Sequence, residues 1–155
     1  MSVAFRRDSD EEVKEPKFEL PLPSGPNLVT VRGLAAIEAK VAAMEATDTA
    51  PMAEDDHAEH LRTLRYWRTR LATAQPAPLP PAGEVAFGSR VVFTLGGETR
   101  TIDIVGDDEA EPAGGRIAFS APLARVLIGG YAGERIDFGG KLEAIEIVST
   151  TPIPA

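Results

Sequence analysis

The residues best suited to chemistry lie in one acidic segment, residues 47–60, which reads TDTAPMAEDDHAEH. Its five carboxylates are Asp48, Glu54, Asp55, Asp56 and Glu59. Carboxylate oxygens are hard ligands of the kind that Mg²⁺ prefers. If a helix begins near Asp55, Asp56 and Glu59 share one of its faces and form the best-placed pair for contact with a metal ion. The alternative is electrostatic, because acids at the start of a helix stabilise the positive end of its dipole.

Other chemistries find little support in the sequence. His57 and His60 lie three residues apart, but the chain has two histidines and no cysteine. A zinc site would therefore need the nearby acids to complete it, and we expect these histidines to lie on a helix face, with no metal site. Neither a glycine-rich phosphate loop nor a Ser-His-Asp arrangement is present. We expect no catalysis by the chain alone and no cofactor of its own.

Two helices are expected to flank the acidic segment. The first runs from Thr30, as N-cap, to about Ala46, and its apolar positions are Leu34, Ile37, Val41 and Met44. The second runs from about Asp55 to Ala74, with apolar positions at Leu61, Leu64, Trp67 and Leu71. The short break between them predicts an antiparallel hairpin with arms of roughly 25–30 Å. The alternative is two helices packed flat on a single core.

Basic residues recur along the second helix, at Arg62, Arg65, Arg68 and Arg70. We interpret them as a solvated face that pairs with Glu38 and Glu45 across the hairpin. Contact with an acidic surface of a partner is the alternative. Trp67 is expected to anchor the base of the hairpin.

From Glu84 the periodicity changes to that of β-strands. Strands are expected over residues 85–93, 99–105, 116–119, 134–138 and 142–148, with turns at Gly96-Gly97 and Gly139-Gly140. A short helix is expected to begin at Pro122, with Ser120 or Ala121 at its cap position. The fold class is therefore α+β: an antiparallel helical hairpin followed by an antiparallel sheet domain with one short helix.

These patterns divide the chain into four parts. We expect a disordered or extended arm at residues 1–27, the hairpin at 28–75, a proline-rich linker at 76–83 and the sheet domain at 84–150. Phe18, Leu20 and Leu22 alternate in the arm, which leaves open a loose or a docked arrangement. No run approaches the roughly 20 apolar residues of a membrane span, so we expect a cytoplasmic protein. The formal net charge of −8 disfavours direct DNA binding and points to a protein partner.

Four blocks of the sheet region, in order, resemble the C-terminal domain of the GreA/GreB transcription factors. They are VAFGSRVVF (85–93), IVGDDEAEP (104–112), RIAFSAPLARVLIGG (116–130) and GERIDFGGKLEAIEI (133–147). More loosely, NLVTVRGLAAIEAKV (27–41) and LRYWRTRLATA (64–74) resemble parts of that family's coiled coil. The resemblance implies an FKBP-like domain that docks on the rim of the RNA polymerase secondary channel. It also implies a coiled coil that points into the channel.

The resemblance also implies which residues dock on the polymerase. They are Asp108, Glu109, Ser120, Ala121, Pro122, Leu123 and Ala124. Ala121 replaces the usual serine of the family's "SPLA" block, and the neighbouring Ser120 is the candidate substitute. Purely structural roles are the alternative, with Leu123 in the core and Glu109 capping a turn.

Departures from the family pattern leave the activity open. Cleavage-stimulating Gre factors carry a "GDLSENAEY"-type motif at the hairpin tip, whose acids help to hold Mg²⁺ in the polymerase's own active centre. Residues 47–60 lack that motif, and each arm is shorter by about two turns. One reading is a factor that stimulates cleavage of backtracked transcripts. The other is a non-cleaving, Rnk-like regulator that competes for the channel. A peptidyl-prolyl isomerase-like module is a third, by fold analogy only.

Overall fold

A computed structural model describes residues 19–154 of the chain, in two compact units. Among the described residues, the first, here called the hairpin unit, comprises residues 19–24 and Ile37–Thr73. The second, the sheet unit, comprises Gly25–Ala36 and residues 74–154. No helix in the described part of the chain is long and apolar enough to cross a membrane.

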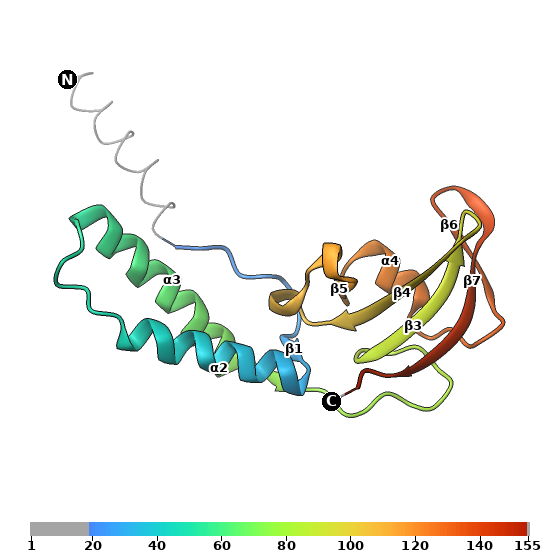
Figure 1. The fold of residues 1–155 in the computed structure, drawn as a ribbon, viewed down its shortest axis with the longest axis horizontal. Coiled ribbons are helices and arrows are strands. Elements are labelled where there is room, and N and C mark those ends of the chain that lie inside the picture. Colours follow the sequence, from blue (N-terminus) through green and yellow to red (C-terminus); the bar gives the residue numbers. More distant parts are fainter. Residues whose placement is uncertain (1–18, 155) are drawn as a thin grey trace, which may run out of the picture. The chain divides into compact units, whose positions relative to one another are not determined.

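The two predicted helices are confirmed as α2 (Val31–Ala46) and α3 (Glu54–Thr73). Their 16 and 20 residues correspond to about 24 and 30 Å of helix. Thr30 is the N-cap of α2, because the Gly33 amide donates to its Oγ1 at 2.9 Å. The helices run in opposite directions and are joined by residues 47–53 (Figure 1).

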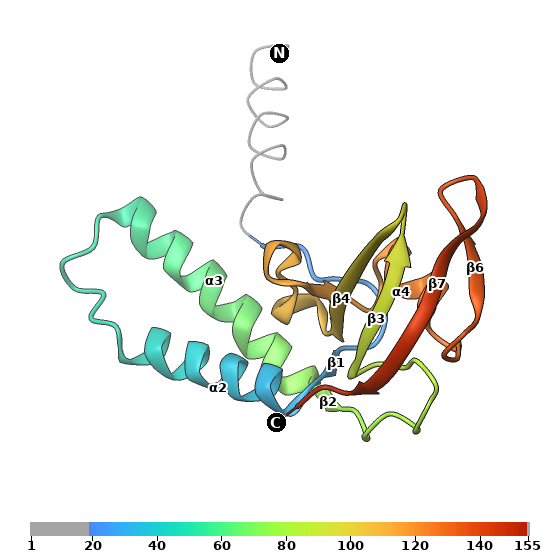
Figure 2. The same cartoon turned by 45° about the vertical axis from the view of Figure 1, so that its right-hand side comes forward.

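The predicted apolar positions of the two helices are most fully buried far from the connection, residues 47–53. Ile37, Val41 and Leu64 are buried, whereas Leu61 is 39% exposed. Figures 1 and 2 both show the helices separating toward residues 47–53. The prediction that Leu61 belongs to the buried seam is wrong, because the two helices diverge on that side.

Residues 1–18, including Phe18, lie outside the described residues, so the prediction of an arm is compared with the structure over residues 19–27. The following segment, residues 19–24, is neither helix nor strand. Leu20 and Leu22 line a hollow on α3 together with Arg65, Tyr66 and Thr69. Both leucines remain exposed, at 41% and 51%, so they lie against α3 without being buried by it.

The sheet unit contains a five-stranded sheet of order β5-β4-β3-β7-β6. The strands are β3 (Ser89–Leu95), β4 (Glu98–Val105), β5 (Arg116–Ala118), β6 (Arg135–Phe138) and β7 (Lys141–Pro152). A two-stranded parallel pair, β1 (Leu28–Val29) with β2 (Gln75–Pro76), and the helix α4 (Pro122–Leu127) complete the unit.

Two turns predicted from glycine pairs are confirmed. Gly96-Gly97 joins β3 to β4, and Gly139-Gly140 joins β6 to β7. In each pair φ is positive at both positions, 61° and 82°. That backbone is the one a two-residue hairpin of type I′ requires, and glycine adopts it without strain.

The expectation of an all-antiparallel sheet is wrong for β5, which pairs in parallel with β4. Between these strands the chain passes through two single-turn 3₁₀ helices, η2 (Asp107–Glu109) and η3 (Pro112–Gly114). This detour lets the chain re-enter the sheet in the same direction, which a two-residue turn does not allow. The first strand is also shorter than predicted, because Gly88 adopts φ 86° and β3 begins at Ser89.

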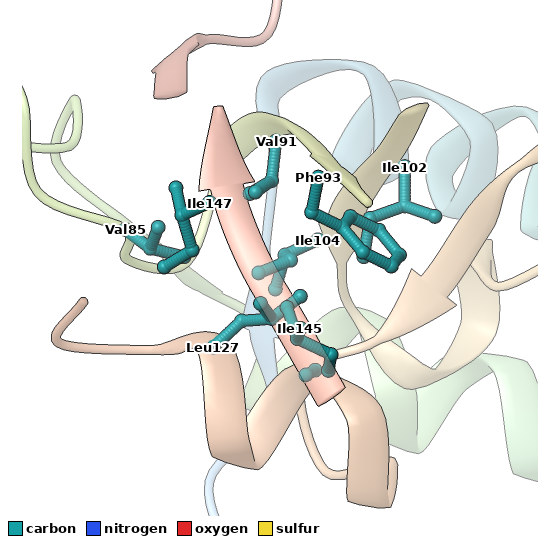
Figure 3. Packing of buried hydrophobic residues seen from close by; sticks show 9 residues of the cluster. Val85, Val91, Phe93, Ile102, Ile104, Leu127, Ile145 and Ile147 are labelled. Atoms are coloured by element: carbon teal, nitrogen blue, oxygen red, sulfur yellow. The ribbon is translucent and has the colours of Figure 1, made fainter. Parts of the chain in front are cut away.

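The core of the sheet unit lies between the sheet and α4. Figure 3 shows Phe93 from the middle strand β3 among side chains of the neighbouring strands and of α4. The buried cluster is Val85, Val91, Phe93, Ile102, Ile104, Ala124, Leu127, Ile145 and Ile147. The strand residues in it alternate with outward-facing ones, as expected for a sheet covered on one face.

Candidate functional site

The acidic residues of the hairpin unit gather at the start of α3. Glu54, Asp55 and Asp56 form its first turn, and all three are exposed. Glu59 follows on α3 and is also exposed. Asp48 lies in the connection, where its Oδ1 accepts a hydrogen bond from the Ala50 amide at 3.0 Å. Acids in a first helical turn stabilise the positive end of the dipole, so the electrostatic role predicted for them fits their placement.

Within residues 19–154, no group of three or more His, Cys, Asp or Glu side chains is arranged to hold a metal ion. Asp56 and Glu59 share the exposed side of α3, and His57 beside them is also exposed. These acids therefore give the exposed surface at the start of α3 a negative charge.

The arginines of α3 do not form one solvated face. Arg68 pairs with Glu45 across the hairpin at 2.7 Å, as predicted, but Arg65 pairs with Glu19 of the arm at 2.8 Å. Arg70 is only 3% exposed, so its placement on a solvated face is wrong. On α3 it follows Tyr66 and Trp67 by four and three residues, so it shares a side of the helix with these two half-buried aromatic residues.

Trp67 is half-buried in the hairpin. The Lys40 ammonium lies 5.6 Å from the centre of its ring, within cation–π range. Tyr66 meets it edge to face, with ring centres 5.1 Å apart. The indole joins α2 to α3, in keeping with the predicted anchor.

Removing the Arg68–Glu45 ion pair is expected to change stability only slightly. Both side chains are about half exposed, so Arg68→Ala should cost about 0.2–1 kcal/mol. Urea titrations of Arg68→Ala, Glu45→Ala and the double variant would give the coupling energy. A coupling above about 2 kcal/mol would show that the pair is far less solvated than its exposure indicates.

In the sheet unit, the predicted docking residues come from η2 and from the start of α4. Ser120 and Pro122 are exposed, and Asp108 is half-buried. The Ser120 hydroxyl donates to Asp107 Oδ1 at 2.7 Å, which ties the two segments together. Together these residues form a surface built on a fixed loop.

Of the two cap positions expected for α4, Ser120 and Ala121, the structure uses the second. Ala121 occupies the N-cap position and no side chain caps the helix. Ser120 therefore does not replace the missing serine as a cap, because its hydroxyl is engaged by Asp107. Pro122 suits the first helical position, where an amide would have no partner within the helix.

Three of the predicted docking residues face inward to different degrees. Ala124 is fully buried, and Leu123 is partly buried against the core cluster. Glu109 uses its carboxylate within the unit, where Oε1 accepts a hydrogen bond from the Thr30 hydroxyl at 2.5 Å. Ser120 and Pro122 are the exposed members of the set, and Asp108 and Ala121 are half-exposed.

Two ionisable groups elsewhere in the sheet unit have shifted pKa values. The hydrogen bond and charge of Asp103 raise the pKa of Arg90, whose Nε and Nη2 donate to that carboxylate at 2.8 and 3.0 Å. The hydrogen bond from the Tyr131 hydroxyl to Glu84 raises the pKa of Tyr131. Each pair joins neighbouring segments of the fold, and neither lies among the acids of the hairpin.

Sequence reasoning missed the residues that join the start of α2 to η2 within the sheet unit. Thr30 was recognised as a cap but not as a partner of Glu109, 79 residues away. Gly33 and Gly106 have ordinary negative φ, so nothing in their local context marked them. Their role lies in close approach between distant segments, which a single sequence does not reveal.

These parts define a class of protein in which an antiparallel helical hairpin is combined with an α+β sheet unit. The sequence model described as the C-terminal part of transcription elongation factor GreA/GreB matches residues 80–151. Transcription elongation factor GreA of Pseudomonas aeruginosa is 31% identical over 141 residues, which cover 88% of this chain and 85% of that protein. GreA of Ralstonia nicotianae is 42% identical over 71 residues, but this match spans less than half of each chain, 43% and 45%.

The chain belongs to the GreA/GreB family of transcription elongation factors. A solved GreA/GreB structure from Nitrosomonas europaea matches 80% of this chain and 98% of its own, at 20% identity and a TM-score of 0.40. The family assignment rests on the sequence matches, because so low a score carries no weight.

Proposed function

We propose that the protein binds RNA polymerase in the bacterial cytoplasm and acts through the secondary channel. The supporting observation is a sequence match to GreA/GreB across the sheet unit, combined with a hairpin that carries exposed acids at its far end. In this proposal the sheet unit docks on the channel rim and the hairpin enters the channel. The net charge of −8 favours contact with a protein over sequence-specific contact with DNA.

The docking surface in this proposal consists of Asp108, Ser120 and Pro122. Their side chains are exposed or half-exposed, and the Ser120–Asp107 hydrogen bond holds the two contributing segments together. A pre-organised surface loses less conformational entropy on binding than a loose one. Ala124 contributes by packing beneath this surface, since it is fully buried.

The hairpin acids decide between two forms of the function. In the first, carboxylates of the hairpin acids, with Asp56 and Glu59 as the best-placed pair, reach the polymerase's active centre and help to hold its Mg²⁺, so that the polymerase hydrolyses its own backtracked transcript. The catalysis then belongs to the polymerase, and this chain supplies ligands only. An inner-sphere ligand must come within about 2.0–2.1 Å of Mg²⁺.

The second form is a non-cleaving competitor for the channel. It is favoured by arms of about 24 and 30 Å, which are short for a hairpin that must reach the metal. It is also favoured by Asp48, whose carboxylate is engaged in a local turn with the Ala50 amide. In this form the exposed acids serve as helix-start charges and as a negative surface.

Transcript shortening in stalled, backtracked elongation complexes separates the two forms. We expect the double variant Asp55→Asn/Asp56→Asn to keep its affinity for polymerase and to lose any shortening seen with the unaltered protein. Asparagine preserves the size of the side chain and tolerates the helix start, so loss of charge is the main change. The change Glu98→Gln, at an exposed acid of the sheet unit, is the control and should have no effect.

Each outcome has a distinct meaning. Shortening that the Asp55/Asp56 variant abolishes supports the cleavage form. Binding to polymerase without shortening supports the competitor form. A protein that does not bind polymerase at all would contradict both.

A further inference from the structure

The start of α2 is held by a contact between residues far apart in the sequence. The Thr30 hydroxyl donates to Glu109 Oε1 at 2.5 Å, and the contact is partly buried. The same hydroxyl oxygen accepts the Gly33 amide at 2.9 Å. One side chain thus caps the helix and joins it to η2, all within the sheet unit.

Gly33 makes room for this contact. A Cβ at this position would lie 2.6 Å from Glu109 Oε1 and 3.3 Å from Thr30 Oγ1. Since Gly33 has no positive φ, its value lies in the missing side chain and not in backbone freedom. Any larger residue would push the Glu109 carboxylate away from Thr30.

A second close approach lies beside the first. A Cβ on Gly106 would lie 2.4 Å from the carbonyl oxygen of Leu28, in β1. Gly106 is also the residue before η2, with φ −74° and ψ 166°, a conformation that any residue adopts. Two independent contacts therefore hold β1 and the first turn of α2 against the loop that carries Glu109.

The chemistry of this contact favours a fixed arrangement. The first turn of a helix presents amides without helical partners and the positive end of the dipole. A carboxylate at this position is stabilised, and a hydroxyl that donates to a charged acceptor forms a stronger bond than one between neutral groups. The four residues Thr30, Gly33, Gly106 and Glu109 are here called the clasp.

We propose that Glu109 is a positioning residue: through the clasp it fixes the first turn of α2, from which the hairpin continues, and it does not contact the partner. This inference rests on the proposed function, because it holds that Glu109, a residue within the sheet unit, positions the hairpin for its entry into polymerase. It also removes Glu109 from the docking set and leaves Asp108, Ser120 and Pro122 there.

Amide hydrogen exchange tests the clasp without any partner. In the full chain, Glu109→Ala is expected to lower the protection of the Gly33 and Leu34 amides about tenfold, the loss that corresponds to one hydrogen bond of about 1.4 kcal/mol. Glu109→Gln keeps an acceptor oxygen and should restore most of the protection. Thr30→Ser keeps the hydroxyl and is the matched control on the other side of the contact.

Photo-crosslinking tests the positioning. A photoreactive residue placed at the exposed Ala50, in the hairpin connection, would report where the hairpin meets polymerase. With Glu109→Ala we expect the polymerase affinity to change less than twofold, while crosslinking from position 50 falls at least fivefold. With Glu109→Gln the crosslinking should recover, which general damage to the fold would not predict.

The possible results separate this inference from the proposed function. Unchanged amide protection in Glu109→Ala would overturn the clasp. Unchanged protection with weakened polymerase binding would show that Glu109 contacts the partner directly. If the unaltered protein does not bind polymerase, both the proposed function and the positioning role of Glu109 fail. Hydrogen exchange would still decide whether the clasp exists, because it needs no partner.

Discussion

Truncation of Phe93 to alanine is expected to lower the free energy of unfolding of the sheet unit by about 3–5 kcal/mol. Phe93 is fully buried on the middle strand β3, among side chains from β4, β7 and α4 (Figure 3). Removing the ring loses the free energy of its apolar burial and leaves a cavity that the neighbouring strands fill only in part. The total stability of a domain is about 5–15 kcal/mol, so much of it would be lost.

Far-UV circular dichroism during urea and thermal unfolding would measure this change. The midpoint temperature should fall by roughly 15 °C or more, given about 4–8 °C per kcal/mol for a unit of this size. Fluorescence of Trp67, the single tryptophan, reports the hairpin unit separately. Phe93→Leu, which keeps most of the volume, should cost less than about 1.5 kcal/mol. Equal losses from both variants would contradict the cavity argument.

Gly106→Ala is expected to cost about 1–3 kcal/mol and to loosen β1 from the sheet unit. The added methyl group would meet the Leu28 carbonyl oxygen, a backbone atom that moves only if β1 moves. The backbone conformation of Gly106 suits alanine, so the whole effect arises from this collision. Chemical denaturation would measure the energy, and exchange of the Gln75 and Ala77 amides, which donate to Asn27 and Val29, would locate the loosening.

Gly114→Ala in η3 is the matched control for Gly106→Ala. Its nearest neighbour would be Glu111 Oε1, at 3.1 Å, the end of an exposed side chain that can shift slightly while its other carboxylate oxygen stays paired with Arg116. The control variant should therefore remain within about 0.5 kcal/mol of the parent. A Gly106→Ala protein as stable as the control would mean that β1 is not held as the structure shows.

The parts of the fold that local physics decides were predictable. Glycine pairs at positions 96–97 and 139–140 require positive φ, and both turns are present. The apolar spacing of residues 30–46 predicted α2, and Thr30 caps it. Element ends shifted by a few residues where pairing extended them, as in β7, which continues to Pro152 alongside β3.

Predictions failed where distant segments decide the outcome. Arg70, on α3, has the residue type of a solvated face but is buried. The direction of β5 depends on the path of the two 3₁₀ helices before it. The sequence left the α4 cap open between Ser120 and Ala121, and the structure decides for Ala121 because the Ser120 hydroxyl donates to Asp107. Each outcome depends on a neighbour that lies elsewhere in the chain.

The same division applies to the candidate site. The sequence by itself determined the family, the acids at Asp55 and Asp56 and the helix that carries them, because charge, periodicity and block order are local properties. Only the tertiary structure decided that Glu109 faces Thr30 and that Ala124 is buried. Hydrogen bonds and burial between segments some 80 residues apart depend on how the chain folds back on itself. The spacing of residues along the sequence does not reveal this path.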